Sequence, residues 1–370
     1  MYKRQIITSY SPYRPFTSIQ ESGLYIKELE NSELTYEKKH ELNIGADMGF
    51  LNNRINLAVD WYKRNNYDLI GIVNTQGAGG QILKYANIAS MKSHGIEFTL
   101  STKNIKTKDF NWNTDFIFSN AKNEVTDLKQ NANVMELISG NGFAKQGYPV
   151  RGLFSIPFVG LDKDGIPVII NEKGEATSTD INFQERQNTG FLKYEGPTDP
   201  TITGSLGNMF SYKGFRLNLF ITYSFGNVIR LNPVFKAYYS DLTAMTREFK
   251  NRWTLPGDEA KTNVPAILSK RMYDSNEDLK YAYNAYNYST ERIAKGDFIR
   301  LKEISLAYDF PKAWINPLKL TDLSLKVQAT NLFLIYADDK LNGQDPEFFN
   351  AGGVASPVPR QFTITLRLGL

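Results

Sequence analysis

The sequence of 370 residues contains no cysteine and only two histidines, His40 and His94. Without cysteine the chain can form neither a disulfide framework nor a thiolate metal site. Two histidines so far apart in the sequence also disfavour a histidine-based metal site or a catalytic triad. The chain therefore offers little of the chemistry that cysteine- and histidine-dependent enzymes use.

Long runs of one residue class are missing as well. No stretch of about 18 apolar residues occurs, which excludes a membrane-spanning helix. The longest basic runs are pairs such as Lys38-Lys39, and the net charge is +4, which does not suggest a nucleic-acid-binding stripe. Residues 1–8 lack the apolar segment and the cleavage site of a signal peptide.

Aromatic residues, by contrast, are abundant, and they stand in segments of strict alternation. Aromatics make up 13% of the chain, which favours strands over helices. From Leu42 to Phe50 every even position is apolar or alanine, and after Asn52-Asn53 the alternation resumes at Ile55. A two-residue turn at Asn52-Asn53 pairs Phe50 with Ile55, so that apolar residues meet across the whole hairpin. The same parity recurs in 96–118, 202–225, 304–329 and 362–370.

The lengths of the connections also alternate. Turns within hairpins are short, as at Lys213-Gly214, whereas the links between hairpins are long. The expected long links are residues 65–94, 120–200, 226–296 and 334–360. Strands of about 9–11 residues joined by alternating short turns and long loops are typical of outer-membrane β-barrels.

Aromatic residues collect near the ends of the predicted strands, on the apolar face. They are Trp61, Trp112, Tyr212, Phe215, Tyr308 and Phe310. In a barrel such rings form girdles at the membrane interface. The alternative is the ordinary core of a β-sandwich.

Several short motifs occur along the chain, at residues 43–62, 87–97, 212–215, 297–311, 329–333, 345–347 and 357–363. They resemble those of one family, the SusC/RagA-type TonB-linked outer-membrane proteins (TonB-dependent receptors). Together they extend over nearly the whole chain and follow the order of the family. The resemblance implies an antiparallel transmembrane barrel of about 22 strands, plugged from the periplasmic side, in the outer membrane of a Gram-negative bacterium.

The resemblance also implies a function and partners. Such receptors import bulky nutrients such as oligosaccharides or peptides with a SusD-like surface lipoprotein and the TonB-ExbB-ExbD complex. No cofactor, metal or catalytic residue is expected. We expect residues 1–370 to be a carboxy-terminal portion of the barrel, with roughly ten to twelve strands and no plug domain. Outer-membrane lipid would cover its apolar face.

Contact residues for the substrate or a partner are sought in the long loops. A tyrosine cluster and an acidic residue in a family motif are the candidates: Tyr281, Tyr283, Tyr286, Tyr288 and Asp345. The rings could stack on sugars or on the lipoprotein, or instead pack the loop on itself, and Asp345 could belong to a structural turn. Asp162–Gly165 and the glycine-rich residues 77–80 are interpreted as a turn and a loop, not as calcium or phosphate sites.

Two other functions remain open on the sequence alone. A secreted or surface carbohydrate-binding β-sandwich would show the same alternation, with its apolar faces packed against each other. A polysaccharide-degrading β-enzyme is weaker, because no pair of carboxylates with a credible cleft can be singled out.

Overall fold

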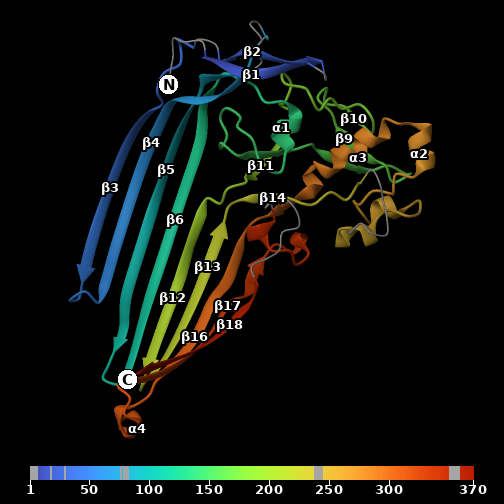
Figure 1. Ribbon diagram of the computed structural model, residues 1–370. Helices are drawn as coiled ribbons and strands as arrows, with labels where there is room; N and C mark the ends of the chain where they lie inside the picture. The colour runs from blue at the N-terminus through green and yellow to red at the C-terminus, as the bar shows by residue number, and fades with distance from the viewer. Residues whose placement is uncertain are drawn as a thin grey trace.

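The centre of the computed structural model is one antiparallel sheet of nine strands in the order β18-β17-β16-β13-β12-β6-β5-β4-β3 (Figure 1). The strands are β3 (Lys38–Phe50), β4 (Ile55–Asn74), β5 (Leu83–Lys106), β6 (Phe110–Leu128), β12 (Ile202–Tyr212), β13 (Phe215–Phe225), β16 (Phe298–Asp309), β17 (Asp322–Ala337) and β18 (Gln361–Gly369). The sheet is open, with β3 and β18 at its two edges. The antiparallel β prediction is confirmed, although the main sheet has fewer strands than the expected ten to twelve.

The structure describes residues 7–16, 19–28, 31–75, 77, 83–236, 245–349 and 359–370. Residues 1–6, 78–80 and 357–358, which entered the sequence interpretation, lie outside this range. Two further strands, β1 (Ile7–Phe16) and β2 (Ile19–Glu28), pair with each other in a separate sheet.

The predicted strand registers are confirmed. Phe50 pairs with Ile55, and the rest of that hairpin follows in step. Tyr212 pairs with Phe215, and Leu206 with Ile221. Register is strongly specified here because a slip by one residue would move every apolar side chain to the other face.

The turn of the first hairpin differs in detail from the prediction. Residues 51–54 form a four-residue loop, in which Leu51, Asn52 and Asn53 all have positive φ angles (54°, 55° and 60°). Asparagine tolerates this left-handed conformation better than most residues do. At Lys213-Gly214 the φ angles are 44° and 89°, as a two-residue type I′ hairpin turn requires.

The long loop predicted for residues 65–94 is largely wrong, because β4 continues to Asn74 and β5 starts at Leu83. The pairing of β4 with β5 continues past an irregularity between Asn66 and Leu69, where Asp68 has a φ of 57°. This bulge interrupts the alternation of apolar and polar residues. A prediction based on strict alternation therefore ends the strand too early.

The other long links fold at one end of the sheet, and the short turns lie at the opposite end (Figure 1). The elements of these links are α1 (Val134–Ile138), β7 (Gly152–Ser155), β8 (Phe158–Leu161), β9 (Pro167–Ile170), β10 (Ala176–Thr177), β11 (Lys193–Pro197), β14 (Val228–Arg230), α2 (Lys270–Ser275), α3 (Leu279–Asn287) and β15 (Ile293–Lys295). Short 3₁₀ turns occur at Arg247–Asn251, Asp258–Ala260, Thr290–Arg292, Asn316–Leu318, Asp339–Leu341 and Pro346–Phe348. At the short-turn end α4 (Lys312–Ile315) joins β16 to β17. We call the two folded links on either side of β12 and β13, residues 129–201 and 226–297, the loop module.

The packed interior belongs to the loop module and not to the sheet. One apolar cluster combines α1 with Phe154, Ile156 and Ile169, and reaches Ala285 of α3. The largest fully buried side chains of the described residues all lie outside the nine strands. Among the described residues no helix is long and apolar enough to cross a membrane.

Candidate functional site

The sheet has one continuous apolar face. Side chains that are paired across neighbouring strands lie on the same face of a sheet. One such row crosses eight strands: Met48, Leu57, Leu100, Phe116, Leu206, Ile221, Leu301 and Phe333. The rows two residues along on either side are also mainly apolar.

This apolar face is exposed and not packed in a core. Ile44 is 60% exposed at one edge of the sheet, and Ile364 is 74% exposed at the other. Met48 and Phe333, within the row named above, are 38% and 51% exposed. A β-sandwich would bury these side chains against a second sheet, so the structure does not support the sandwich alternative.

The opposite face is polar. Its central row contains Gly49, Asn56, Ser101, Asp115, Gly207, Phe220, Glu303, Thr330 and Gln361. The Ser101 hydroxyl donates to Asp115 at 2.6 Å, and the Asn218 amide donates to Glu303 at 3.4 Å. Polar groups of this kind are stable in contact with water, as on the inside of a large barrel.

The predicted interface aromatics fall into two groups on the apolar face. At the short-turn end the ring centroids of Phe215 and Tyr308 are 4.4 Å apart, and those of Tyr308 and Phe310 are 4.9 Å apart. Tyr212 pairs with Phe215 in the same row. Trp61 lies near the other end of the face, paired with Ile44 and Ile96.

Trp112 belongs to the group at the short-turn end and introduces a polar contact there. Its ring stacks on Phe210 at 5.6 Å, and its indole N–H donates to the Asn208 side chain at 2.9 Å. The Thr114 hydroxyl donates to the same oxygen at 2.7 Å. These polar groups on an apolar face therefore have protein partners, which hydrocarbon surroundings would demand.

A buried arginine ties the loop module together. Arg230, which is 7% exposed, donates to the carbonyl oxygens of Ser289 at 2.9 Å, Phe154 at 2.6 Å and Ile138 at 3.3 Å. Burial lowers the pKa of Arg230 to about 9, which still leaves the guanidinium charged at neutral pH. One side chain thus holds β14, α1, β7 and the segment after α3.

Two further buried arginines hold the segments next to β16 and β17. Arg292 forms an ion pair with Glu248 and donates to the carbonyl oxygen of Asn232 at 2.7 Å. Arg300, on the polar face of the sheet, binds the carboxylate of Asp345 at 2.5 Å, and Glu347 lies 3.3 Å away. Asp345 also accepts a bond from the backbone N–H of Glu347. The carboxylate of Asp345 is therefore engaged by protein groups, as the structural-turn alternative implies.

The tyrosine cluster divides between the interior and the surface. Tyr283 and Tyr286 are each 1% exposed and lie on the inner side of α3, and burial raises the pKa of Tyr286. Tyr281 is 41% exposed and Tyr288 is partly buried. Loop packing thus accounts for Tyr283 and Tyr286, and Tyr288 packs against the apolar cluster around α1. Tyr281 is the most exposed of the four tyrosines.

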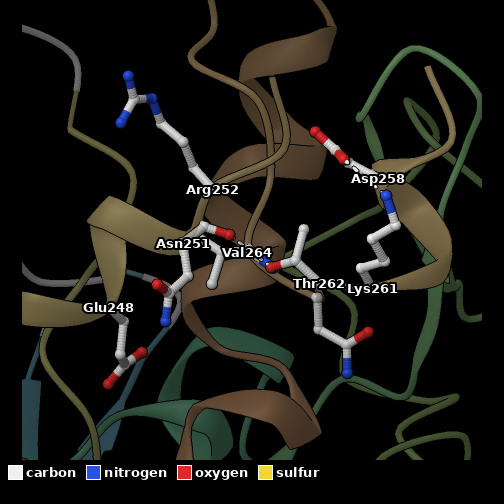
Figure 2. Close-up of a pocket in the computed structure, with 8 residues that line it drawn as sticks. Glu248, Asn251, Arg252, Asp258, Lys261, Thr262 and Val264 are labelled. Carbon is white, nitrogen blue, oxygen red and sulfur yellow. Dashed lines mark hydrogen bonds and ion pairs between the residues drawn. The ribbon is translucent and has the colours of Figure 1, made fainter. Parts of the chain in front are cut away.

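An open, polar cavity of about 490 Å³ lies in the segment before α2 (Figure 2). Its lining is Glu248, Asn251, Arg252, Asp258, Lys261, Thr262, Asn263 and Val264. Lys261 lies 3.7 Å from Asp258, whose pKa is lowered by a hydrogen bond from the backbone N–H of Leu255. Seven of the eight lining side chains are polar, but Glu248 is already engaged by Arg292 and Asn342, and the Asn263 amide donates to Glu291. No local pattern in the sequence marks the residues that line this cavity.

Residues Asp162–Gly165, which the sequence analysis compared with a calcium loop, form a turn. The Asp162 carboxylate accepts bonds from the backbone N–H groups of Asp164 and Ile166, both at 2.9 Å. Gly165 has a φ of 75°, as the tight turn between β8 and β9 requires. The turn interpretation is confirmed, and the described residues contain no group of three or more histidine and acidic side chains that could hold a metal.

Comparison with known proteins gives the same architecture. No family model matches the chain. The RagAB peptide importer in its open-open state superposes over 100% of this chain and 38% of the solved chain, with a TM-score of 0.74 at 24% identity. "TonB-dependent receptor P3" of Formosa agariphila is 25% identical over 368 residues, which cover 92% of this chain and 34% of the relative. "TonB-dependent receptor SusC" of Bacteroides thetaiotaomicron is 26% identical over 364 residues, which cover 92% and 32%.

The chain is a homologue of the SusC/RagA-type TonB-dependent receptors. These receptors are outer-membrane transporters of Gram-negative bacteria and not enzymes. The chain spans about a third of the length of the relatives it matches.

The residues that sequence reasoning missed are the three buried arginines. Arg230 donates hydrogen bonds to residues 59 to 92 positions away in the sequence, so no local sequence pattern predicts its role. The interior side of α3 did carry a signal, because Leu279, Ala282, Tyr283 and Tyr286 follow the spacing of one helical face.

Proposed function

We propose that this chain forms part of the wall and the outer loops of a TonB-dependent importer of bulky nutrients, such as oligosaccharides or peptides. The observation that carries the proposal is the exposed apolar face of the nine-stranded sheet, combined with the packed loop module at one end. Lipid is the partner that such a face requires, since a face this apolar is rarely left in water.

The height of the apolar face supports the proposal. On β6 the face extends from Phe110, in the row of Tyr212, to Asn120, in the row of Trp61. Eleven residues at a rise of roughly 3.3 Å, tilted by about 40°, span about 25 Å along the membrane normal. An apolar band of about 25 Å is the height that outer-membrane barrels present to lipid.

The open edges of the sheet indicate what completes it. Backbone groups at the edges of β3 and β18 need partners in hydrocarbon, because an unpaired group costs several kcal/mol there. In our proposal, residues 1–370 are the carboxy-terminal portion of the barrel. The other strands of about 22, and the plug, belong to the rest of the receptor. The TonB-ExbB-ExbD complex would act through that part.

We expect the loop module to contact the substrate and the SusD-like lipoprotein. Short turns face the periplasm and long loops face outward in outer-membrane barrels, so the module lies outside the cell. The similar solved structures are those of the RagAB peptide importer. By this similarity we expect a SusD-like lipoprotein over the module, with Tyr281 and the cavity of Figure 2 as candidate contacts for the lipoprotein or the substrate.

Membrane fractionation and gel mobility test the proposal. The gene that encodes this chain should be expressed at its native length in a Gram-negative host. We expect the product in the outer-membrane fraction, with a mobility that changes on boiling, and we expect deletion of the gene to abolish growth on one oligomeric nutrient. A product found in the soluble fraction, with the same mobility before and after boiling, would refute the proposal.

A further inference from the structure

The row directly above the apolar band on three neighbouring strands is basic. Lys63 of β4 pairs with His94 of β5, and His94 pairs with Lys122 of β6. Lys63 lies two residues from Trp61, and His94 lies two residues from Ile96, so the row shares the apolar face. It lies towards the long-loop end, beyond the last apolar row.

The basic row lacks the counter-charges that its neighbours have. On these strands and on the neighbouring β3, Lys92 lies 2.9 Å from Glu124, Arg64 lies 2.8 Å from Glu41, and Lys38 lies 2.7 Å from Asp68. Within the described residues, Lys63, His94 and Lys122 make no hydrogen bond or ion pair, and all three are exposed.

Two lysines on either side of His94 concentrate positive charge on this part of the apolar face. Lys63 and Lys122 flank His94 across two strand spacings, which is roughly 10 Å. Ammonium and imidazole N–H groups at this separation can converge on one or two phosphate groups.

The surface just below the row is apolar. Ile44, Trp61 and Ile96 are 60%, 38% and 40% exposed, and they lie in the adjacent row of the same face. A ligand that fills both rows must carry anionic groups next to acyl chains. Tryptophan also prefers this boundary between apolar and polar surroundings.

We propose that Lys63, His94 and Lys122 bind the phosphate groups of a phosphorylated lipid in the outer leaflet, with its acyl chains against Trp61 and Ile96. The site rests on the proposed membrane orientation, because only that orientation places the row at the level of the outer headgroups. Binding is expected to weaken with salt, since the contacts are charge-assisted and exposed.

A binding assay with a double variant tests the site. The receptor that contains this chain should be purified in a non-ionic detergent. Binding of bisphosphorylated lipid A, and of the same lipid after enzymatic removal of its phosphates, should be measured by native mass spectrometry. Lys63→Gln with Lys122→Gln should weaken binding of the phosphorylated lipid about 25-fold, at roughly fivefold per lysine near an anionic lipid. Both proteins should bind the dephosphorylated lipid equally.

Lys106→Gln is the matched control, because Lys106 is an exposed lysine on the polar face near the short-turn end. Equal affinity of the wild type and the double variant, or an equal loss in Lys106→Gln, would overturn the phosphate site. An equal loss of affinity for the dephosphorylated lipid in the double variant would also overturn it, since the lysines would then not act through the phosphate groups. Failure of the proposed function would be seen separately, as absence of the product from the outer membrane.

Discussion

Placing a charge on either side of one strand provides a test of the proposed membrane orientation. Phe116 and Ile117 are neighbours in β6, so their side chains point to opposite faces. Phe116 lies in the central apolar row, where its ring centroid is 6.0 Å from that of Phe98 and 6.3 Å from that of Tyr223. Ile117 lies on the polar face and is 46% exposed. Phe116→Arg and Ile117→Arg therefore add the same charge on opposite faces.

The expected cost of Phe116→Arg has two parts. Loss of two aromatic contacts costs about 1–3 kcal/mol, at roughly 0.5–1.5 kcal/mol each. An arginine that faces lipid near the middle of the bilayer costs a further 2–4 kcal/mol or so. The variant Phe116→Leu removes the ring without adding charge, so the difference between the two variants isolates the lipid term. Ile117→Arg should lower the free energy of unfolding by less than about 1 kcal/mol, because the guanidinium group would lie in a water-filled lumen.

Urea unfolding of the receptor in lipid vesicles gives these free energies directly. Each variant should be compared with the wild type at the same lipid composition. If Phe116→Arg and Ile117→Arg lose equal stability once the ring term is subtracted, the apolar face does not contact hydrocarbon and the orientation is wrong.

Three further predictions concern the loops. Arg300→Met should destabilise the protein by about 3–5 kcal/mol, because the Asp345 carboxylate would remain buried without its partner. Limited proteolysis should detect the release of residues 338–349. As a control, Glu347→Gln changes a more exposed carboxylate and should alter stability by less than about 1 kcal/mol. Arg230→Met should remove the side-chain donor of three carbonyl oxygens, although that of Ser289 still accepts from the backbone N–H of Arg292. The change should speed hydrogen exchange in α1 and β7, while exchange in the sheet stays unchanged. Tyr281→Ala should leave stability within about 0.5 kcal/mol of the wild type and weaken substrate or lipoprotein binding at least fivefold, measured by calorimetry; unchanged affinity would remove Tyr281 from the contact set.

The sequence was sufficient for the register of the sheet, because alternation and turn chemistry are local. Phe50 and Ile55, or Tyr212 and Phe215, are separated by a few residues, and one parity decides every pair in their hairpins. The bulge beside Asp68 was missed since it breaks that parity, and the length of β4 and β5 was underestimated with it.

Contacts of the loop module could not be derived in the same way. The partners of Arg230 lie on two separate links, and nothing in their local sequences marks the carbonyl oxygens that it binds. The interior position of Tyr283 was accessible in principle from helical spacing, but a short helix in a long loop gives a weak periodic signal.

The separate core of the loop module has a consequence for how such receptors diverge. The wall is specified by parity and the module by its own packing around α1, β7 and α3, so a substitution in one leaves the other largely undisturbed. Lineages can therefore remodel the outward surface by insertion, deletion or exchange while inheriting an unchanged membrane frame. Because Ala285 and Arg230 join the first link to the second, chimaeras should exchange residues 129–200 and 226–297 together, and we expect such chimaeras still to assemble.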